Sequence, residues 1–375
     1  MRVLYGLLGA LIVGGTFSSV LRTLVIPRPT RSGFTRAVHA VVHVPFQFVA
    51  DRCRTPEAKD RVLAPVAAVS ILFNLISWLI AFWAGYALLQ ASVSDLGTLE
   101  ALREAGSSLF TLGFASSHHV DLTVIDFCAA ATGPITIGLQ IGYLPTLYAA
   151  YSRREAEVTL LQARAGTPPW GPEILARYAQ IGVTDSLAEM FRNWERWAAE
   201  VSESHTSYIV LSRFRSPQPN RNWLVALLAV MDAAAMQLAL NPGRPQAEAR
   251  LALRAGYVCL RDIGDIWRVK YDPDPSPEAP IRLTYEDFAA AVAHAAANGY
   301  PLERTPEEAW PHFRGWRVNY EELAYRFAYL FDAVPAPWSG PRRTLEETMM
   351  PITPVDRRPA GPASGAGPGP GPSMA

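Results

Sequence analysis

The sequence predicts an all-α integral membrane protein that carries a helical domain on the cytoplasmic side. Three observations lead to this prediction. Long uncharged runs lie within the first 151 positions, basic residues flank these runs unevenly, and the chain that follows lacks continuous β alternation. Hydrophobic residues make up 50% of the 375 positions and charged residues 18%, which is on the apolar side of average.

Three runs without charged residues cover residues 3–21, 62–89 and 127–151. A helix that crosses the hydrocarbon core needs about 20 apolar residues, because its backbone groups must bond internally. The first run also has the length of a signal peptide. Only Arg2 precedes it, however, and a dense basic stretch follows it, which favours a retained span.

The basic residues around the runs predict the orientation of the chain. Arginine and lysine crowd the segment between the first two runs and return after residue 152, whereas 90–126 is mainly acidic. The positive-inside rule therefore predicts a multi-pass protein of the cell membrane with its N-terminus outside. The predicted parts are a span over 1–25, a basic connector over 26–61, a pore module over 62–151 (spans 62–89 and 127–151), a cytoplasmic helical domain over 152–335 and a disordered tail over 336–375.

The segment between the second and third runs contains a short helix signal. Asp95 is a suitable N-cap, and leucines recur at helical spacing up to Leu109. A helix over 99–110 would extend roughly 18 Å, about half a bilayer. A strip that contains a glycine follows it. A half-length helix, such a strip and then a span are typical of a re-entrant pore loop, which we predict over 95–119.

Span, half-helix, T-L-G-F at 111–114 and span together resemble the pore module of potassium channels, whose filter reads T-V-G-Y-G. The chain is most similar to two-span, channel-like membrane proteins of actinobacteria. In that group T-L-G-F-G-D precedes a last span that ends in G-Y-L-P-x-L-Y and R-R-E, which stand here at 142–148 and 153–155. The segments 203–208 and 214–217 are also similar to that group. The resemblance covers most of residues 1–335.

The resemblance implies a homotetramer in a lipid bilayer that conducts a monovalent cation, with K⁺ expected and no cofactor. The implied selectivity filter consists of Thr111, Leu112, Gly113, Phe114 and Ala115. Backbone oxygens of such a filter replace the hydration shell of the ion. Gly113 permits a backbone conformation that a Cβ would resist, and the half-helix directs its partly negative C-terminus toward the pore.

Two positions at the pore mouth depart from the resembled filter. Ala115 stands where glycine is expected, and Ser116 stands where aspartate is expected. Alanine costs about 1–2 kcal/mol if that position is left-handed. Asp121 is the nearby acidic residue that would replace the lost charge electrostatically. Two functions are therefore compatible with the sequence: a conducting channel subunit, or a non-conducting channel-derived scaffold whose helical domain binds partners.

Glycines in the last span suggest a gating hinge at Gly133, Gly138 and Gly142. Small residues also let membrane helices approach closely, so packing is the alternative interpretation. Two prolines, Pro134 and Pro145, favour a kink in the same span.

Other patterns predict neither an enzyme nor a metal centre. His39 and His43 lie on a half-apolar stretch over 37–50, which predicts a helix in the inner interface, and a metal pair there would lack a third ligand. The three cysteines lie far apart, and no nucleophile elbow, phosphate loop or paired-carboxylate motif is present. The net charge of +0 gives no indication of a nucleic-acid partner.

The predicted cytoplasmic domain contains one run, 223–240, that is apolar enough to be a fourth span. Asp232 at its centre and basic residues at both ends favour a core helix of the domain instead. The tail from residue 336 onward is rich in proline and glycine, which predicts disorder.

Overall fold

The computed structural model describes residues 1–26, 33–115, 120–343 and 347–352. The regular elements in these ranges are helices, and the β pairing found there is one isolated bridge between Thr167 and Ile352. The predicted all-helical fold is confirmed. The α-helices are α1 (Arg2–Leu24), α2 (Gly33–Ala50), α3 (Pro56–Leu63), α4 (Val66–Val93), α5 (Thr98–Leu109), α6 (Thr123–Ala165), α7 (Gly171–Gln180), α8 (Leu187–Ser207), α9 (Trp223–Leu240), α10 (Ala247–Trp267), α11 (Tyr285–Ala297), α12 (Pro306–Arg317) and α13 (Glu321–Leu330), with short 3-10 turns η1 (Val120–Leu122), η2 (Thr184–Ser186) and η3 (Ile209–Arg213).

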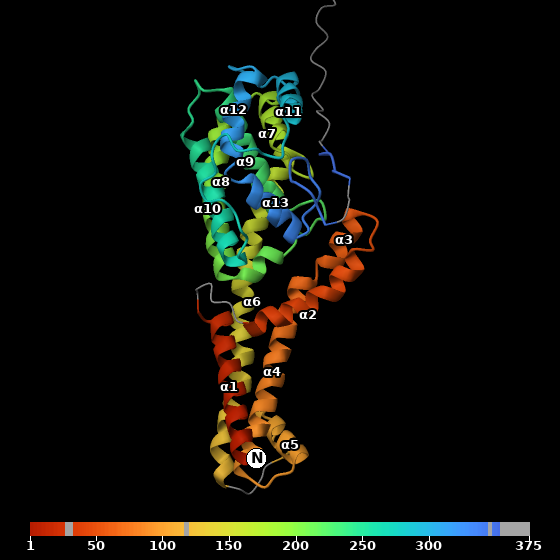
Figure 1. Cartoon of the computed structure of the whole chain (residues 1–375), viewed down its shortest axis with the longest axis vertical. Helices are drawn as coiled ribbons and strands as arrows, with labels where there is room; N and C mark the ends of the chain where they lie inside the picture. The colour runs from red at the N-terminus through yellow and green to blue at the C-terminus, as the bar shows by residue number, and fades with distance from the viewer. Residues whose placement is uncertain (27–32, 116–119, 344–346, 353–375) are drawn as a thin grey trace, which may run out of the picture.

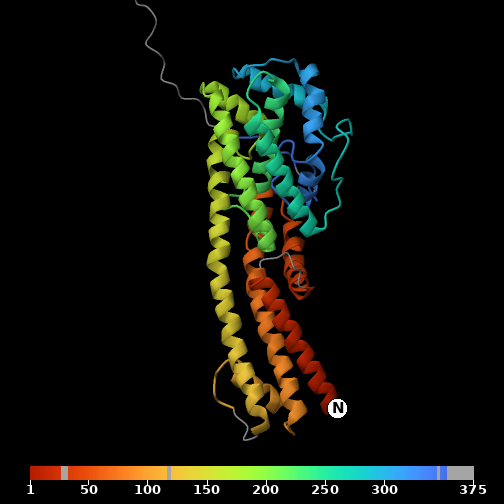
Figure 2. The same cartoon turned by 90° about the vertical axis from the view of Figure 1, so that its left-hand side faces the viewer.

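The molecule is elongated, with a narrow leg and a wider head (Figure 1, Figure 2). The leg contains α1, α4, α5 and the first half of α6, and the head contains α7 to α13. Helices α2 and α3 lie between them at the waist. The N-terminus and α5 share the end of the leg farthest from the head, where Arg2 forms an ion pair with Asp95.

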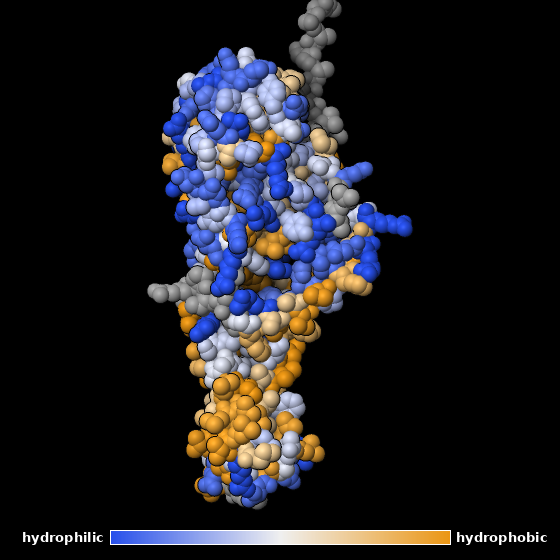
Figure 3. Space-filling model, viewed as in Figure 1, coloured by the Kyte–Doolittle hydropathy of each residue, from blue (hydrophilic) through white to orange (hydrophobic). Residues whose placement is uncertain are grey.

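The leg has the apolar surface of membrane spans. Its helices within Arg2–Leu24, Pro56–Val93 and Val120–Ala165 are long and apolar enough to cross a membrane. Figure 3 shows hydrophobic residues over much of the leg and hydrophilic residues over the head and at the tip of the leg. The prediction of three long apolar helices in the first part of the chain is therefore confirmed by length and composition.

Close contacts between small residues hold α1 against α4. A methyl group on Gly9 would lie 2.8 Å from the backbone oxygen of Gly85, so the two backbones touch without side chains between them. One polar contact adds specificity, because Trp78 Nε1 donates to Ser19 Oγ at 3.0 Å. Helix α1 therefore packs directly along α4.

Helix α6 joins the leg and the head without interruption. It has 43 residues and spans about 64 Å at 1.5 Å per residue, with Pro134 and Pro145 inside it. The predicted boundary between the pore module and the helical domain, at residues 151 and 152, falls inside this helix. The third long apolar run and the start of the head therefore belong to one continuous helix.

Helix α9 is the fourth helix with the length and composition of a span, but protein surrounds it. All 18 of its residues are buried. Asp232 at its centre forms an ion pair with Arg317 of α12 and accepts a hydrogen bond from Tyr320 Oη at 2.8 Å. Because the carboxylate is fully partnered inside the head, this setting supports the interpretation of α9 as a core helix.

Part of the predicted disordered tail packs on the head. Arg342, which is 9% exposed, donates to the backbone oxygens of Ala333 and Val334, and Ser339 is also buried. The head therefore includes residues 336–343, which the sequence predicted to be disordered. The reason is that Arg342 bonds several backbone carbonyl groups, and the composition of the tail does not reveal such contacts. Residues 344–346 and 353–375 lie outside the described ranges.

Candidate functional site

The predicted half-helix is α5, which packs between α4 and α6. Its backbone is fixed to α4 by Trp83, whose indole Nε1 donates to Leu102 O at 2.8 Å. Ala101, Ala105 and Leu109 point into this interface and are essentially buried. With 12 residues, α5 extends about 18 Å, which matches the predicted half-bilayer length.

Helix α5 ends in a Schellman motif at the first residue of the predicted filter. Leu112 N donates to Ser107 O at 2.8 Å and Thr111 N donates to Ser108 O at 3.0 Å. Thr111 takes the left-handed position of this motif, with φ of 54°. A β-branched residue rarely adopts such a conformation, and its cost is about 1–2 kcal/mol. Thr111 thus belongs to the helix end, and the strip proper begins after it.

Residues 112–115 lie beyond the helix without regular structure. Leu112 is 62% exposed and Phe114 is 60% exposed, so the strip is uncovered in the single chain. Gly113 has φ of +69°, a conformation that favours glycine. Among the described residues, no donor bonds to the backbone oxygens of 111–115. These oxygens are therefore available to an external ligand.

The end of the strip is tied back to α5 by a side chain that the sequence did not single out. Ala115 N donates to Ser107 Oγ at 3.1 Å. Ala115 is not among the described residues with positive φ, so the strain that alanine would suffer in a left-handed conformation does not arise here. Ser116, the first predicted mouth residue, lies outside the described ranges, and Asp121, the second, is exposed in η1.

Asp126 braces the base of the loop from α6. Its Oδ1 accepts hydrogen bonds from Gln90 Nε2 of α4 at 2.7 Å and from Ser108 Oγ of α5 at 3.0 Å. One carboxylate thus joins both spans of the predicted pore module to the half-helix. In the sequence, Asp126 stands out only as a carboxylate at the edge of an apolar run. Its role could not be predicted, because its partners lie on two other helices.

The three candidate hinge glycines have different surroundings. A methyl group on Gly133 would lie only 2.0 Å from Leu109 O, so α5 rests directly on α6 at this point. Gly138 and Gly142 have open space where a Cβ would lie. The surroundings of Gly133 support the close-packing alternative, whereas the other two lie on a face of α6 that the single chain leaves uncovered. That face also carries Pro134, Ile135, Ile137, Ile141 and Pro145.

The R-R-E segment of α6 meets two other segments of the predicted motif set inside the head. Arg154 is 2% exposed and donates to His205 Nε2 at 3.0 Å, to Leu211 O at 2.9 Å and to Phe214 O at 2.8 Å. It also pairs with Glu155 at 2.7 Å. Since the guanidinium can only donate, the ring of His205 accepts at Nε2 and is neutral. Burial and the charge of Arg154 both hold the pKa of His205 well below its usual value.

A second buried junction joins the connector before α4 to the head. Lys59 of α3 pairs with Asp332 at 2.8 Å, and both side chains are buried. Arg215 pairs with Asp60 of α3 and also donates to the backbone oxygens of Phe331 and Asp332, both at 3.0 Å. The F-R-S-P segment that contains Arg215 therefore holds the start of α4 against the head. We call this set of residues the connector junction.

No protein-family model, curated protein or solved structure matches this chain. The arguments on its function therefore rest on its own residues and on the geometry described above. That geometry does not include a cluster of three or more metal-ligating side chains among the described residues.

Proposed function

We propose that this chain is one subunit of a homotetrameric, potassium-channel-like pore for monovalent cations. The observation that carries the proposal is the relation between α5 and the strip after it. The C-terminal end of α5 carries partial negative charge, and the next residues leave their backbone oxygens without donors in the described chain. Polar backbone within a membrane is tolerated where it lines a water-filled path or is buried in protein, and a cation favours such oxygens.

A single chain supplies one pore loop, and a closed ring of carbonyl oxygens requires several copies around an axis. The uncovered face of α6 gives a second reason for assembly, because it presents apolar residues and glycines without a partner in the single chain. In this proposal four such faces surround the axis. The leg crosses the cell membrane with the N-terminus and α5 outside and the head in the cytoplasm, as the basic residues of the connector predict.

The two junctions provide a route by which the head would control the pore. Helix α4 is attached through α3 to the head by Lys59 and Asp60, and α6 enters the head and is fixed there by Arg154. Buried ion pairs are costly to break singly, so each junction moves as a unit. A change in the head would therefore displace both spans that flank the loop.

A non-conducting scaffold is the second candidate, and the composition of the pore mouth favours it. Serine at position 116 removes the charge that would collect cations, and Asp121 is exposed in a turn next to α6. In this alternative the leg is an anchor and the head binds partners. The same junctions would then hold the head at a fixed height above the membrane.

Ion flux through purified protein in liposomes tests the proposal. Gly113→Ala should abolish flux, because a Cβ resists the backbone conformation of the strip. The matched control is Gly182→Ala in the head, where φ is +73° and a Cβ also meets open space, so it carries a similar backbone strain far from the loop. Flux in the native chain and in the control, but not in Gly113→Ala, is the expected result. Silence of the native chain would refute conduction.

A further inference from the structure

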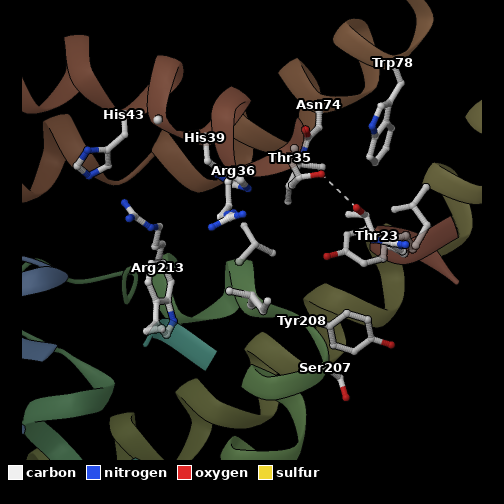
Figure 4. Close-up of a pocket in the computed structure, with 18 of the residues that line it drawn as sticks. Thr23, Thr35, Arg36, His39, His43, Asn74, Trp78, Ser207, Tyr208 and Arg213 are labelled. Atoms are coloured by element: carbon white, nitrogen blue, oxygen red, sulfur yellow. Dashed lines mark hydrogen bonds between the residues drawn. The ribbon is translucent and has the colours of Figure 1, made fainter. Parts of the chain in front are cut away.

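A cavity of about 450 Å³ lies at the waist, between the leg and the head. Its walls come from the end of α1, the inner face of α2, α4, α6 and the η3 turn. Figure 4 shows Arg36, His39 and His43 on α2 facing Arg213 of η3 across the open space. The cavity therefore lies between α2 of the connector and η3 of the head. The connector junction joins the same two parts at a different place, through α3.

The charge that lines the cavity is positive. Arg22, Arg36, Arg213 and Arg343 contribute guanidinium groups, and the lining contains no aspartate or glutamate among the described residues. No described carboxylate lies within 4.0 Å of the guanidinium groups of Arg22, Arg36 or Arg213. Arginines that approach one another without a counter-charge repel, and an anion between them removes this repulsion.

The titratable groups of the cavity respond to this excess of positive charge. Burial, together with Arg213, lowers the pKa of His39 to about 4, and burial with Arg213 and Arg343 lowers the pKa of His43 to about 4. Burial and Arg343 lower the pKa of Arg213 to about 10. The two histidines are therefore neutral near pH 7, whereas Arg213 stays charged, and an anion beside these groups would favour their charged forms.

Two buried amide side chains on the membrane side of the cavity each have one polar atom without a hydrogen bond. Asn74 of α4 and Gln140 of α6 are each 5% exposed, and Asn74 Oδ1 and Gln140 Nε2 make no hydrogen bond. Both line the cavity. A buried polar atom without a partner costs about 1–3 kcal/mol, so a ligand that brings hydrogen-bonding atoms to this part of the cavity would remove that cost.

Apolar side chains complete the wall between these polar groups and the leg. Leu24, Ile71, Trp78 and Tyr143 line the cavity around Asn74 and Gln140. Val41 and Phe48 of α2 do not line the cavity and are 71% and 60% exposed, as expected for a helix that lies in the interface. The cavity thus opens at the predicted level of lipid headgroups, with basic residues at the head and apolar residues toward the leg.

We propose that this cavity binds a phosphate-bearing amphiphile, with the phosphate between Arg36 and Arg213 and the glycerol or acyl part beside Asn74 and Trp78. An anionic phospholipid of the inner leaflet has this combination of charge, polar backbone and chain. The site is independent of ion conduction, since it lies at the waist and uses no residue of the loop. A bound lipid would bridge α2 and η3 and so stabilise the contact between connector and head.

Native mass spectrometry of the detergent-solubilised full chain tests the proposal. The protein is titrated with dioleoyl phosphatidylglycerol and, separately, with dioleoyl phosphatidylcholine, which has the same chains but no net charge. Phosphatidylglycerol should bind at least about tenfold more tightly, and Arg36→Gln/Arg213→Gln should remove this preference, since each juxtamembrane arginine contributes severalfold. The matched control is Arg54→Gln/Arg61→Gln, which removes two exposed arginines of the same connector outside the cavity. The control should keep the preference.

Two further arms make the outcome decisive. Glycerol 3-phosphate and inorganic phosphate at millimolar concentration compete for the phosphate position without an acyl chain. Weak competition supports a lipid, whereas binding as tight as that of phosphatidylglycerol keeps the phosphate site and assigns it to a soluble anion. If the double variant does not fold, Arg36→Gln alone, at an exposed position, replaces it. Equal binding of the two lipids, or an equal loss in the connector control, would overturn the proposal.

Discussion

Lys59 of α3 and Asp332, the second residue after α13, form a buried ion pair 273 positions apart in the chain, with Lys59 Nζ 2.8 Å from the carboxylate. Gln47 of α2 also donates to Asp332, at 3.3 Å. This carboxylate therefore collects the ends of both connector helices and holds them against the head. Because α4 follows α3 directly, the pair also holds the start of α4 close to the head.

Breaking this pair should destabilise the waist. Lys59→Met leaves Asp332 buried without its cation, which costs about 3–5 kcal/mol. We expect a lower Tm of the purified protein in detergent, together with faster proteolysis between α2 and α4. Lys270→Met, at an exposed lysine of the head, is the matched control and should keep the native Tm. Equal melting of the two variants would show that the junction contributes nothing to stability.

Gly133 and Gly138 should respond differently to the same substitution. Gly133→Ala places a methyl group against Leu109 O and should displace α5, with a cost of about 1–3 kcal/mol. Gly138→Ala meets open space in the chain and should be neutral or stabilising by about 0.5–1 kcal/mol, as for alanine in a helix. Thermal melting of both variants checks this. If Gly138→Ala is the more damaging, its face of α6 is in close contact within the assembly.

Restoring the resembled filter should increase selectivity. Ala115→Gly with Ser116→Asp restores the residues of the resembled filter at the two positions where this chain differs, and it adds a negative charge at the mouth. We expect a higher ratio of potassium to sodium flux than in the native chain, measured in the same liposomes. Ala115→Gly alone separates the backbone from the charge: it should change little, because Ala115 does not have positive φ. Conduction by the restored chain alone would favour the scaffold function for the native protein.

Acid should destabilise the head through His205. The pKa of His205 is well below its usual value in the folded state because of burial and Arg154, whereas it is about 6.5 when unfolded. The unfolded chain therefore binds the extra proton first, so stability is complete above about pH 6.5 and falls by about 1.4 kcal/mol per unit below it. His205→Gln should reduce this slope, and His312→Gln, at an exposed position, should not. His39 and His43, whose pKa values are about 4, should supply the slope that remains in His205→Gln.

Labelling from outside the cell tests the proposed topology. In a background without Cys53 and Cys128, Leu99→Cys places an exposed thiol on α5 and Leu251→Cys places one on α10. A membrane-impermeant maleimide should modify Leu99→Cys on intact cells and Leu251→Cys only after permeabilisation. The reverse pattern would invert the orientation predicted from the connector arginines.

Local properties of the chain were enough to predict the helices of the leg. Each apolar run is contiguous, so its length and lack of charge follow from the sequence without knowledge of the fold. The same is true of α5, whose leucine spacing and following glycine predict a half-helix and a strip. The sequence also favoured α9 as a core helix, since Asp232 interrupts its apolar run. The partner of that carboxylate, Arg317, was not predictable because it lies 85 positions away.

The sequence by itself determined which segments are helical and apolar, and where the loop lies between two of them. Only the tertiary structure decided that α6 continues into the head, that Asp126 braces α5, and that Arg154 meets His205. It alone created the cavity at the waist, whose arginines come from α1, α2, η3 and the chain after α13. The physical reason is that hydrophobicity and helix periodicity are sums over neighbouring residues. An ion pair or a cavity depends on where the chain returns, which is set by packing of the whole molecule.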